Sequence, residues 1–122
     1  MLLFRTLLSF FIFINVNFLF STDYKLKNIL FSDNLQSKSL RIVLDLTHKA
    51  PYTVFLLNNN PRLVIDLESK SEIKKFKNES IYIKNIRTRK TDQNVMRVVF
   101  DLKSNFYIDK HFYLKKNEKK YL

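Results

Sequence analysis

One six-residue pattern occurs three times in this chain and constrains its fold more than any other feature. Each copy reads Arg, apolar, Val, apolar, Asp, Leu, and the copies occupy residues 41–46, 62–67 and 97–102. Side chains alternate faces along a strand, so the second, fourth and sixth positions share an apolar face, opposite Arg, Val and Asp. The pattern predicts three half-buried strands whose inward residues are Ile42, Leu44, Leu46, Leu63, Ile65, Leu67, Val98, Phe100 and Leu102.

The chain also contains an internal duplication. The first and third copies of the pattern are 56 residues apart, and Asn28-Ile29 precedes the first at nearly the same offset as Asn85-Ile86 precedes the third. Alternation with period two continues between the copies, which is typical of strands. We expect strands at residues 25–32, 40–47, 52–58, 62–67, 81–89, 95–102 and 106–114, with a fragment at 120–122.

Two such units predict an all-β fold, a β-sandwich of two pseudo-symmetric sheets. Residues 68–80 are poor in apolar side chains, and we expect them to link the halves near the middle of the chain. The second half stops earlier than the first: with a two-residue insertion, Leu122 aligns with Val64, so the last strand is expected to be incomplete. Either the fold tolerates a shortened strand or the chain is a truncated product, and we favour truncation.

The first 21 residues have a different character from the rest. Arg5 is their only charged side chain, and residues 6–20 form an apolar run that is shorter than a bilayer crossing requires. This pattern predicts a helical signal peptide in front of a domain at residues 22–122. No small-x-small triplet marks a cleavage site, so an uncleaved membrane anchor remains the alternative. We expect export, with membrane contact only through this segment.

The composition excludes several classes of function. The chain has no glycine and no cysteine, so it lacks glycine-rich phosphate loops, disulfides, thiol nucleophiles and cysteine zinc sites. His48 and His111 lie in opposite halves without an indicated third ligand, and we predict no metal site and no cofactor. The net charge of +11 suits an acidic partner, but the export pattern argues against nucleic acid.

The order of motifs resembles that of the AMIN domain. The stretch RIVLDLTHKAPYTVFLLNNNPRLVIDL, followed by a linker and MRVVFDL, carries this resemblance, which extends from about Lys25 to Leu122. The family occurs before the catalytic domain of periplasmic N-acetylmuramoyl-L-alanine amidases and in type IV pilus secretins. The resemblance implies a β-sandwich located in the periplasm.

For function, the resemblance implies a non-catalytic module that binds peptidoglycan and targets a cell-wall amidase to the division septum. The zinc amidase domain of that family is absent from this sequence, so we expect no catalytic residue and no enzymatic activity. We interpret the chain as a truncated amidase precursor. The alternative is an envelope assembly module that docks on another protein, as in the pilus secretins.

The candidate binding residues come from the outward faces of the predicted strands. Arg donors and carboxylate acceptors suit the carboxylates and hydroxyls of peptidoglycan, but the same groups can pair with each other across neighbouring strands. Exposed tyrosine rings of the segment 106–114 can stack on sugars. The candidates are Arg41, Asp45, Arg62, Asp66, Arg97, Asp101, Tyr107 and Tyr113.

Overall fold

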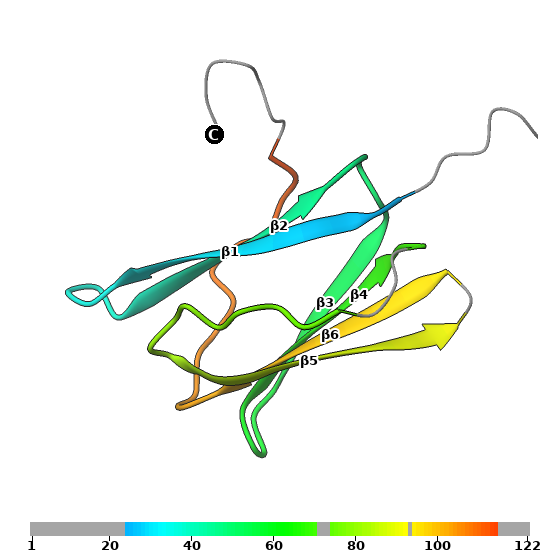
Figure 1. Cartoon of the computed structure of the whole chain (residues 1–122). Helices are drawn as coiled ribbons and strands as arrows, with labels where there is room; N and C mark the ends of the chain where they lie inside the picture. The colour runs from blue at the N-terminus through cyan, green and yellow to red at the C-terminus, as the bar shows by residue number, and fades with distance from the viewer. Residues whose placement is uncertain (1–23, 71–73, 93, 115–122) are drawn as a thin grey trace, which may run out of the picture.

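In the computed structural model, residues 24–70, 74–92 and 94–114 are described, and all regular structure among them is β. The strands pair antiparallel in a two-stranded sheet, β1-β2, and a four-stranded sheet, β3-β4-β6-β5 (Figure 1). This confirms the predicted all-β fold, whereas the predicted signal helix and the fragment at 120–122 lie outside the described residues. The strands are β1 (Leu26–Asn34), β2 (Ser39–Leu46), β3 (Tyr52–Leu57), β4 (Arg62–Glu68), β5 (Ile83–Asp92) and β6 (Val95–Leu102).

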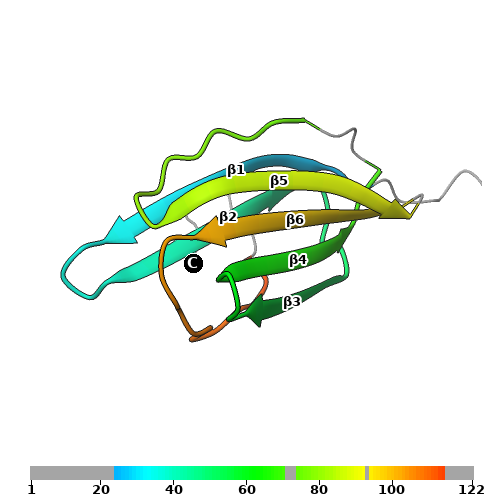
Figure 2. The same ribbon diagram turned by 90° about the horizontal axis from the view of Figure 1, so that it is seen from below.

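The two sheets form the two layers of a sandwich, with the core between them (Figure 2). Phe31 of β1 meets Phe100 of β6 edge to face, with ring centroids 6.1 Å apart, and so joins the layers. All nine residues predicted to point inward belong to this core or pack against it. Those on β6 are buried, and those on β2 are only partly buried.

The duplication is visible in the backbone. The β1-β2 and β5-β6 hairpins have the same antiparallel register, with Ile29 opposite Leu44 in one and Ile86 opposite Phe100 in the other. Each hairpin has a register shift at the equivalent place, before Asn28 and before Asn85 respectively. The sheets themselves differ in size, because the described part of the chain gives β1 and β2 no further strand neighbour.

In the turns of this glycine-free chain, residues other than glycine adopt positive φ angles. Asn60, in the connection between β3 and β4, has a φ of 54°, in the left-handed region that Asn enters more easily than most residues. The sequence of this connection, Asn58-Asn59-Asn60-Pro61, consists of residue types that favour turns. Lys38, between β1 and β2, also has a positive φ, of 51°, although its sequence gives no such signal.

The prediction of a strand at residues 106–114 is wrong. These residues are irregular, although apart from Lys110 their side chains alternate between apolar and polar. By the duplication they correspond to β3, which has β4 as its strand neighbour. No described residue supplies an equivalent neighbour for 106–114, so the alternation has no ladder to join.

Side chains hold this irregular segment in place instead. Phe106 stacks edge to face on Tyr82, and the Tyr113 hydroxyl donates a hydrogen bond to the carbonyl of Ala50. The segment therefore runs from the end of β6 back to the connection between β2 and β3 (Figure 1, orange).

Between β4 and β5 the described residues 69–70 and 74–80 are also irregular, whereas Glu68, the first residue of the predicted linker, belongs to β4. Lys70 donates its amide to the carbonyl of Tyr24, and Ser80 donates its hydroxyl to Asp33 of β1, so the linker packs along the other sheet. The described part of the chain holds no helix with the length and hydrophobicity that a bilayer crossing requires.

Candidate binding surface

The outward face of the four-stranded sheet carries ion pairs between strands. Asp66 of β4 lies opposite Arg97 of β6. The guanidinium donates from Nε to Oδ1 at 2.7 Å and from Nη2 to Oδ2 at 2.8 Å, and the pair is partly buried. These hydrogen bonds are the main reason that the pKa of Asp66 lies below its usual range, and burial opposes them. They also raise the pKa of Arg97.

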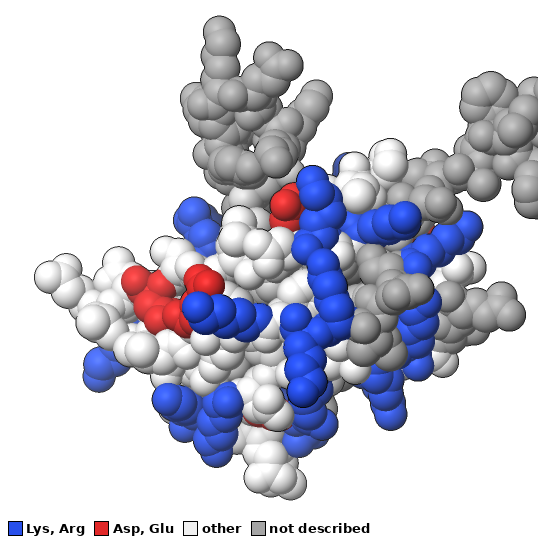
Figure 3. All heavy atoms as spheres, viewed as in Figure 1, with Lys and Arg blue, Asp and Glu red and all other residues white. Residues whose placement is uncertain are grey.

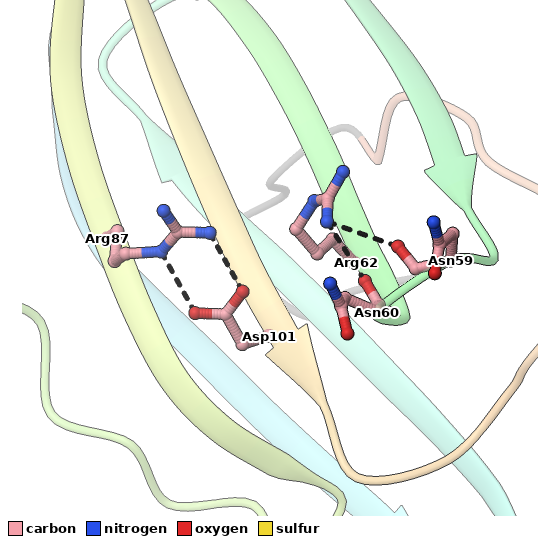
Figure 4. Close-up of polar contacts among 5 residues, drawn as sticks. All are labelled: Asn59, Asn60, Arg62, Arg87 and Asp101. Atoms are coloured by element: carbon pink, nitrogen blue, oxygen red, sulfur yellow. Dashed lines mark hydrogen bonds and ion pairs between the residues drawn. The ribbon is translucent and has the colours of Figure 1, made fainter.

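A second ion pair joins β5 to β6. Arg87 donates from Nε and Nη2 to the two carboxylate oxygens of Asp101, at 2.9 and 2.8 Å (Figure 4). The register places Arg62 of β4 opposite the same carboxylate. Arg62 instead leans toward the β3-β4 turn, where Nη1 donates to the carbonyls of Asn59 and Asn60, both at 3.2 Å.

Two arginines of this face form no ion pair with another described residue. Arg62 makes no ion pair with a described residue, and the same holds for Arg89, which lies opposite Arg97 in the β5-β6 register. Arg89 is close enough to Asp66 to contribute to the lowered pKa of that carboxyl. The face therefore combines two ion-paired arginines, Arg87 and Arg97, with two arginines that have no ion pair among the described residues.

An apolar strip crosses the same face between the ion pairs. Phe55 of β3, Val64 of β4 and Val99 of β6 are neighbours in the ladder. Val64 is only 4% exposed although it points outward. The Arg97 guanidinium lies 5.9 Å from the centroid of the Phe55 ring, so the long cationic side chain passes over this strip.

The structure separates the predicted site residues. Arg62, Asp66, Arg97 and Asp101 share the face just described, whereas Arg41 and Asp45 lie on β2 in the other sheet. Neither of these two β2 side chains forms an ion pair with a residue in the described ranges. The predicted tyrosines are also apart from the arginine face: both belong to the irregular segment, and Tyr107 is 83% exposed.

Tyr113 belongs to an aromatic cluster at the start of β3. Its ring meets that of Tyr52 edge to face at 5.1 Å, and Lys49 lies 4.6 Å above it. The Tyr52 hydroxyl is hydrogen bonded to Nδ1 of His111 at 2.8 Å. Burial, followed by the nearby Tyr113, raises the pKa of Tyr52.

Sequence reasoning missed Arg87, Arg89 and the Tyr52-His111 contact. The two arginines had a usable signal, since they are two residues apart in a predicted strand and so share a face. The contact between Tyr52 and His111 had none, because it joins residues 59 positions apart across an irregular segment.

Charge and composition of the surface limit the chemistry that it can perform. Lys and Arg side chains cover more of the face seen in Figure 3 than acidic side chains do. Among the described residues no three His, Asp or Glu side chains are grouped closely enough to hold a metal ion. The cationic and hydroxyl-bearing side chains of the surface suit acidic or polyhydroxylated ligands.

Comparison with known proteins identifies the family. The family model described as the AMIN domain matches residues 28–120. The chain belongs to the AMIN domain family. AMIN domains are known from periplasmic cell-wall amidases and from secretins, and the domain by itself is not catalytic. No curated protein and no solved structure matches the chain significantly.

Proposed function

We propose that this AMIN domain is a peptidoglycan-binding module of the periplasm, which holds a cell-wall amidase at the division septum. The observation that carries the proposal is the pair of arginines, Arg62 and Arg89, that have no ion pair with any described carboxylate, on a face where the neighbouring arginines have one. Membership in the AMIN family supports the cell-wall setting.

The chemistry of peptidoglycan suits this face. Its peptide stems carry carboxylates, and a guanidinium can donate two parallel hydrogen bonds to a carboxylate. The two carbonyls that accept from Nη1 of Arg62 hold this side chain in place before a ligand arrives. Less side-chain entropy is then lost on binding.

The aromatic cluster at Tyr52 and Tyr113 offers a second type of contact. A tyrosine ring packs against the apolar face of a sugar while its hydroxyl end keeps polar partners. Lys49, above the Tyr113 ring, adds a cation beside this cluster. Repeated weak contacts of both types along a glycan strand would give a useful total affinity.

The test is sedimentation of the full chain with purified peptidoglycan sacculi at physiological salt, in a mild non-ionic detergent. We expect Arg62→Gln combined with Arg89→Gln to weaken binding by about tenfold, since two charge-assisted hydrogen-bonded contacts would be lost. Lys38→Gln, an exposed change in the β1-β2 turn, removes one charge away from this face and is expected to change binding little. No sedimentation of the unmodified chain would contradict the proposal.

A second candidate function is docking on another envelope protein, as in the secretins. Phe55 and Leu57 favour it, because they are 38% and 37% exposed on β3, an edge strand of the four-stranded sheet. Edge strands bind partner strands through their free backbone groups. If Phe55→Ser with Leu57→Ser abolishes copurification of an envelope protein while sacculus binding is absent in all variants, this second function replaces the first.

A further inference from the structure

Among the described residues, the strand β2 lacks a neighbour that its duplicated counterpart has. β6 lies between β4 and β5, whereas β2 pairs with β1 alone among the described residues. The inward residues of β6 are fully or nearly fully buried: Met96, Val98, Phe100 and Leu102. Their equivalents on β2, 56 residues earlier, all remain partly exposed: Leu40, Ile42, Leu44 and Leu46. In the described part of the chain, the outer edge of β2 is thus unpaired and the apolar residues beside it are only partly covered.

The β4-β6 ladder shows which strand fits such an edge. Two copies of the hexamer pair antiparallel there, with Val64 opposite Val99 and Asp66 opposite Arg97. The third position of one copy meets the third position of the other, and the fifth meets the first. The pattern is therefore self-complementary in this register, because every Arg position faces an Asp position.

The charged side chains of β2 could form the same type of cross-strand pair with a neighbouring hexamer strand. Arg41 and Asp45 occupy the positions of Arg97 and Asp101, yet neither has an ion-pair partner in the described part of the chain. On β6 the equivalent carboxylate, that of Asp101, accepts hydrogen bonds from Arg87 of the adjoining strand β5. In β1 the equivalent of that arginine is Leu30, which offers Asp45 no competing cation.

We propose that β2 pairs with β2 of a second copy of this chain, forming a symmetric homodimer. Val43 would lie opposite the partner's Val43 on the two-fold axis. Arg41 would lie opposite the partner's Asp45, and Asp45 opposite the partner's Arg41. The contact is isologous, as a two-fold dimer requires. The two β1-β2 sheets become one four-stranded sheet, β1-β2-β2-β1, with the hexamer strands in its centre, as in the sheet β3-β4-β6-β5.

A second copy is the occupant that the observations favour. It carries the required hexamer by definition, and it brings the same unsatisfied edge, so both copies gain backbone hydrogen bonds and cover for their apolar residues. A contact through one strand edge is smaller than a standard stable interface, so the dimer is expected to be weak and dependent on concentration.

The test is analytical ultracentrifugation of the full chain over a range of concentrations at low and high salt. We expect a reversible dimer that weakens at high salt. Arg41→Asp alone and Asp45→Arg alone each place like charges opposite each other, and each is expected to be monomeric. The double variant restores opposite charges in reversed order and is expected to dimerise. An equimolar mixture of the two single variants is expected to form a heterodimer for the same reason.

Lys84→Asp serves as the matched control, because it changes an exposed charge on β5 by the same amount. It is expected to leave dimerisation unchanged. Thermal unfolding of each variant separates loss of the dimer from loss of the fold. A monomer at every concentration, or a dimer unaffected by the single charge reversals, would overturn the proposal.

A second readout does not depend on charge. Val43→Cys introduces a thiol into a chain that has no cysteine, and the proposed axis places two such thiols near each other. We expect a short thiol-specific crosslinker to join Val43→Cys copies efficiently, and Thr53→Cys copies, changed on the exposed edge strand β3, much less. Equal crosslinking of both variants would also count against the dimer.

Discussion

Asp66 and Arg97 lie opposite each other on β4 and β6, and two hydrogen bonds of 2.7 and 2.8 Å join their charged groups. They belong to two copies of the same hexamer, which run antiparallel. Strand pairing therefore explains part of the repeated charge, namely Asp66 of one copy and Arg97 of another. The proposed ligand contacts rest on Arg62 and Arg89, which form no ion pair with a described residue.

The Asp66-Arg97 pair is expected to stabilise the fold more than the Asp101-Arg87 pair. Asp66→Asn removes the charge of a partly buried pair and should lower the free energy of unfolding by about 1 to 2 kcal/mol. The Arg87 side chain is 54% exposed, so Asp101→Asn should cost less, about 0.5 kcal/mol. Urea unfolding of both variants measures the difference, and equal losses would contradict the ranking.

The same pair predicts a dependence on pH. The pKa of Asp66 is lower in the folded protein than in the unfolded chain, so the charged carboxyl stabilises the fold above the unfolded value of about 3.9. This contribution is lost as the pH falls from there through the lower folded pKa. Unfolding measured from pH 7 to pH 2 should show the unmodified chain and Asp66→Asn converging below about pH 4. A constant gap at all pH values would contradict this assignment.

The strands that the sequence predicts correctly are those that combine alternating apolar and polar side chains with a neighbouring strand in the sheet. Ile65 and Phe100 point into the core as the hexamer indicates, because period two in an apolar sequence has one compatible burial pattern. Residues 106–114 also alternate, apart from Lys110, but form no strand. Alternation decides which face is buried, whereas a strand also needs a neighbour, and that neighbour depends on distant parts of the chain.

The binding surface could be predicted only in part, for the same reason. The sequence indicates that Arg62 and Asp101 point outward, but not that the carboxylate binds Arg87 rather than Arg62. That choice depends on β5 lying beside β6 and on the turn carbonyls that hold Arg62. Likewise, the sequence pattern predicts that Tyr107 and Tyr113 lie on the outward face of a strand, but the segment that contains them forms no strand.

Phe100 is expected to contribute most to the core that joins the sheets. It is completely buried and meets Phe31 of the opposite layer, so Phe100→Ala should lower the free energy of unfolding by about 3 to 5 kcal/mol. Phe112→Ala is the matched control, since this ring is 56% exposed, and its effect should stay within about 0.5 kcal/mol. Comparable losses for the two variants, measured by urea unfolding, would show that the sheets are held together elsewhere.

The Asp33 carboxylate is expected to hold the end of the linker, at Ser80 and Ile81, against the two-stranded sheet. Its Oδ1 accepts the hydroxyl of the buried Ser80 at 2.7 Å, and its Oδ2 accepts the amide of Ile81 at 3.0 Å. Asp33→Ala leaves both donors without this acceptor and should lower the free energy of unfolding by about 1 to 3 kcal/mol.

The local effect of this change distinguishes fastening from general destabilisation. Amide hydrogen exchange at Ile81 should become faster in Asp33→Ala by about tenfold or more, because the segment before β5 can then open without unfolding the sheet. Amides in the centre of β6, such as that of Val98, should change only as much as the global stability does. Asp109→Ala, at an exposed position of the irregular segment, should leave Ile81 unchanged. If Ile81 and Val98 respond equally to the loss of Asp33, the carboxylate supports the whole fold and does not specifically hold the linker.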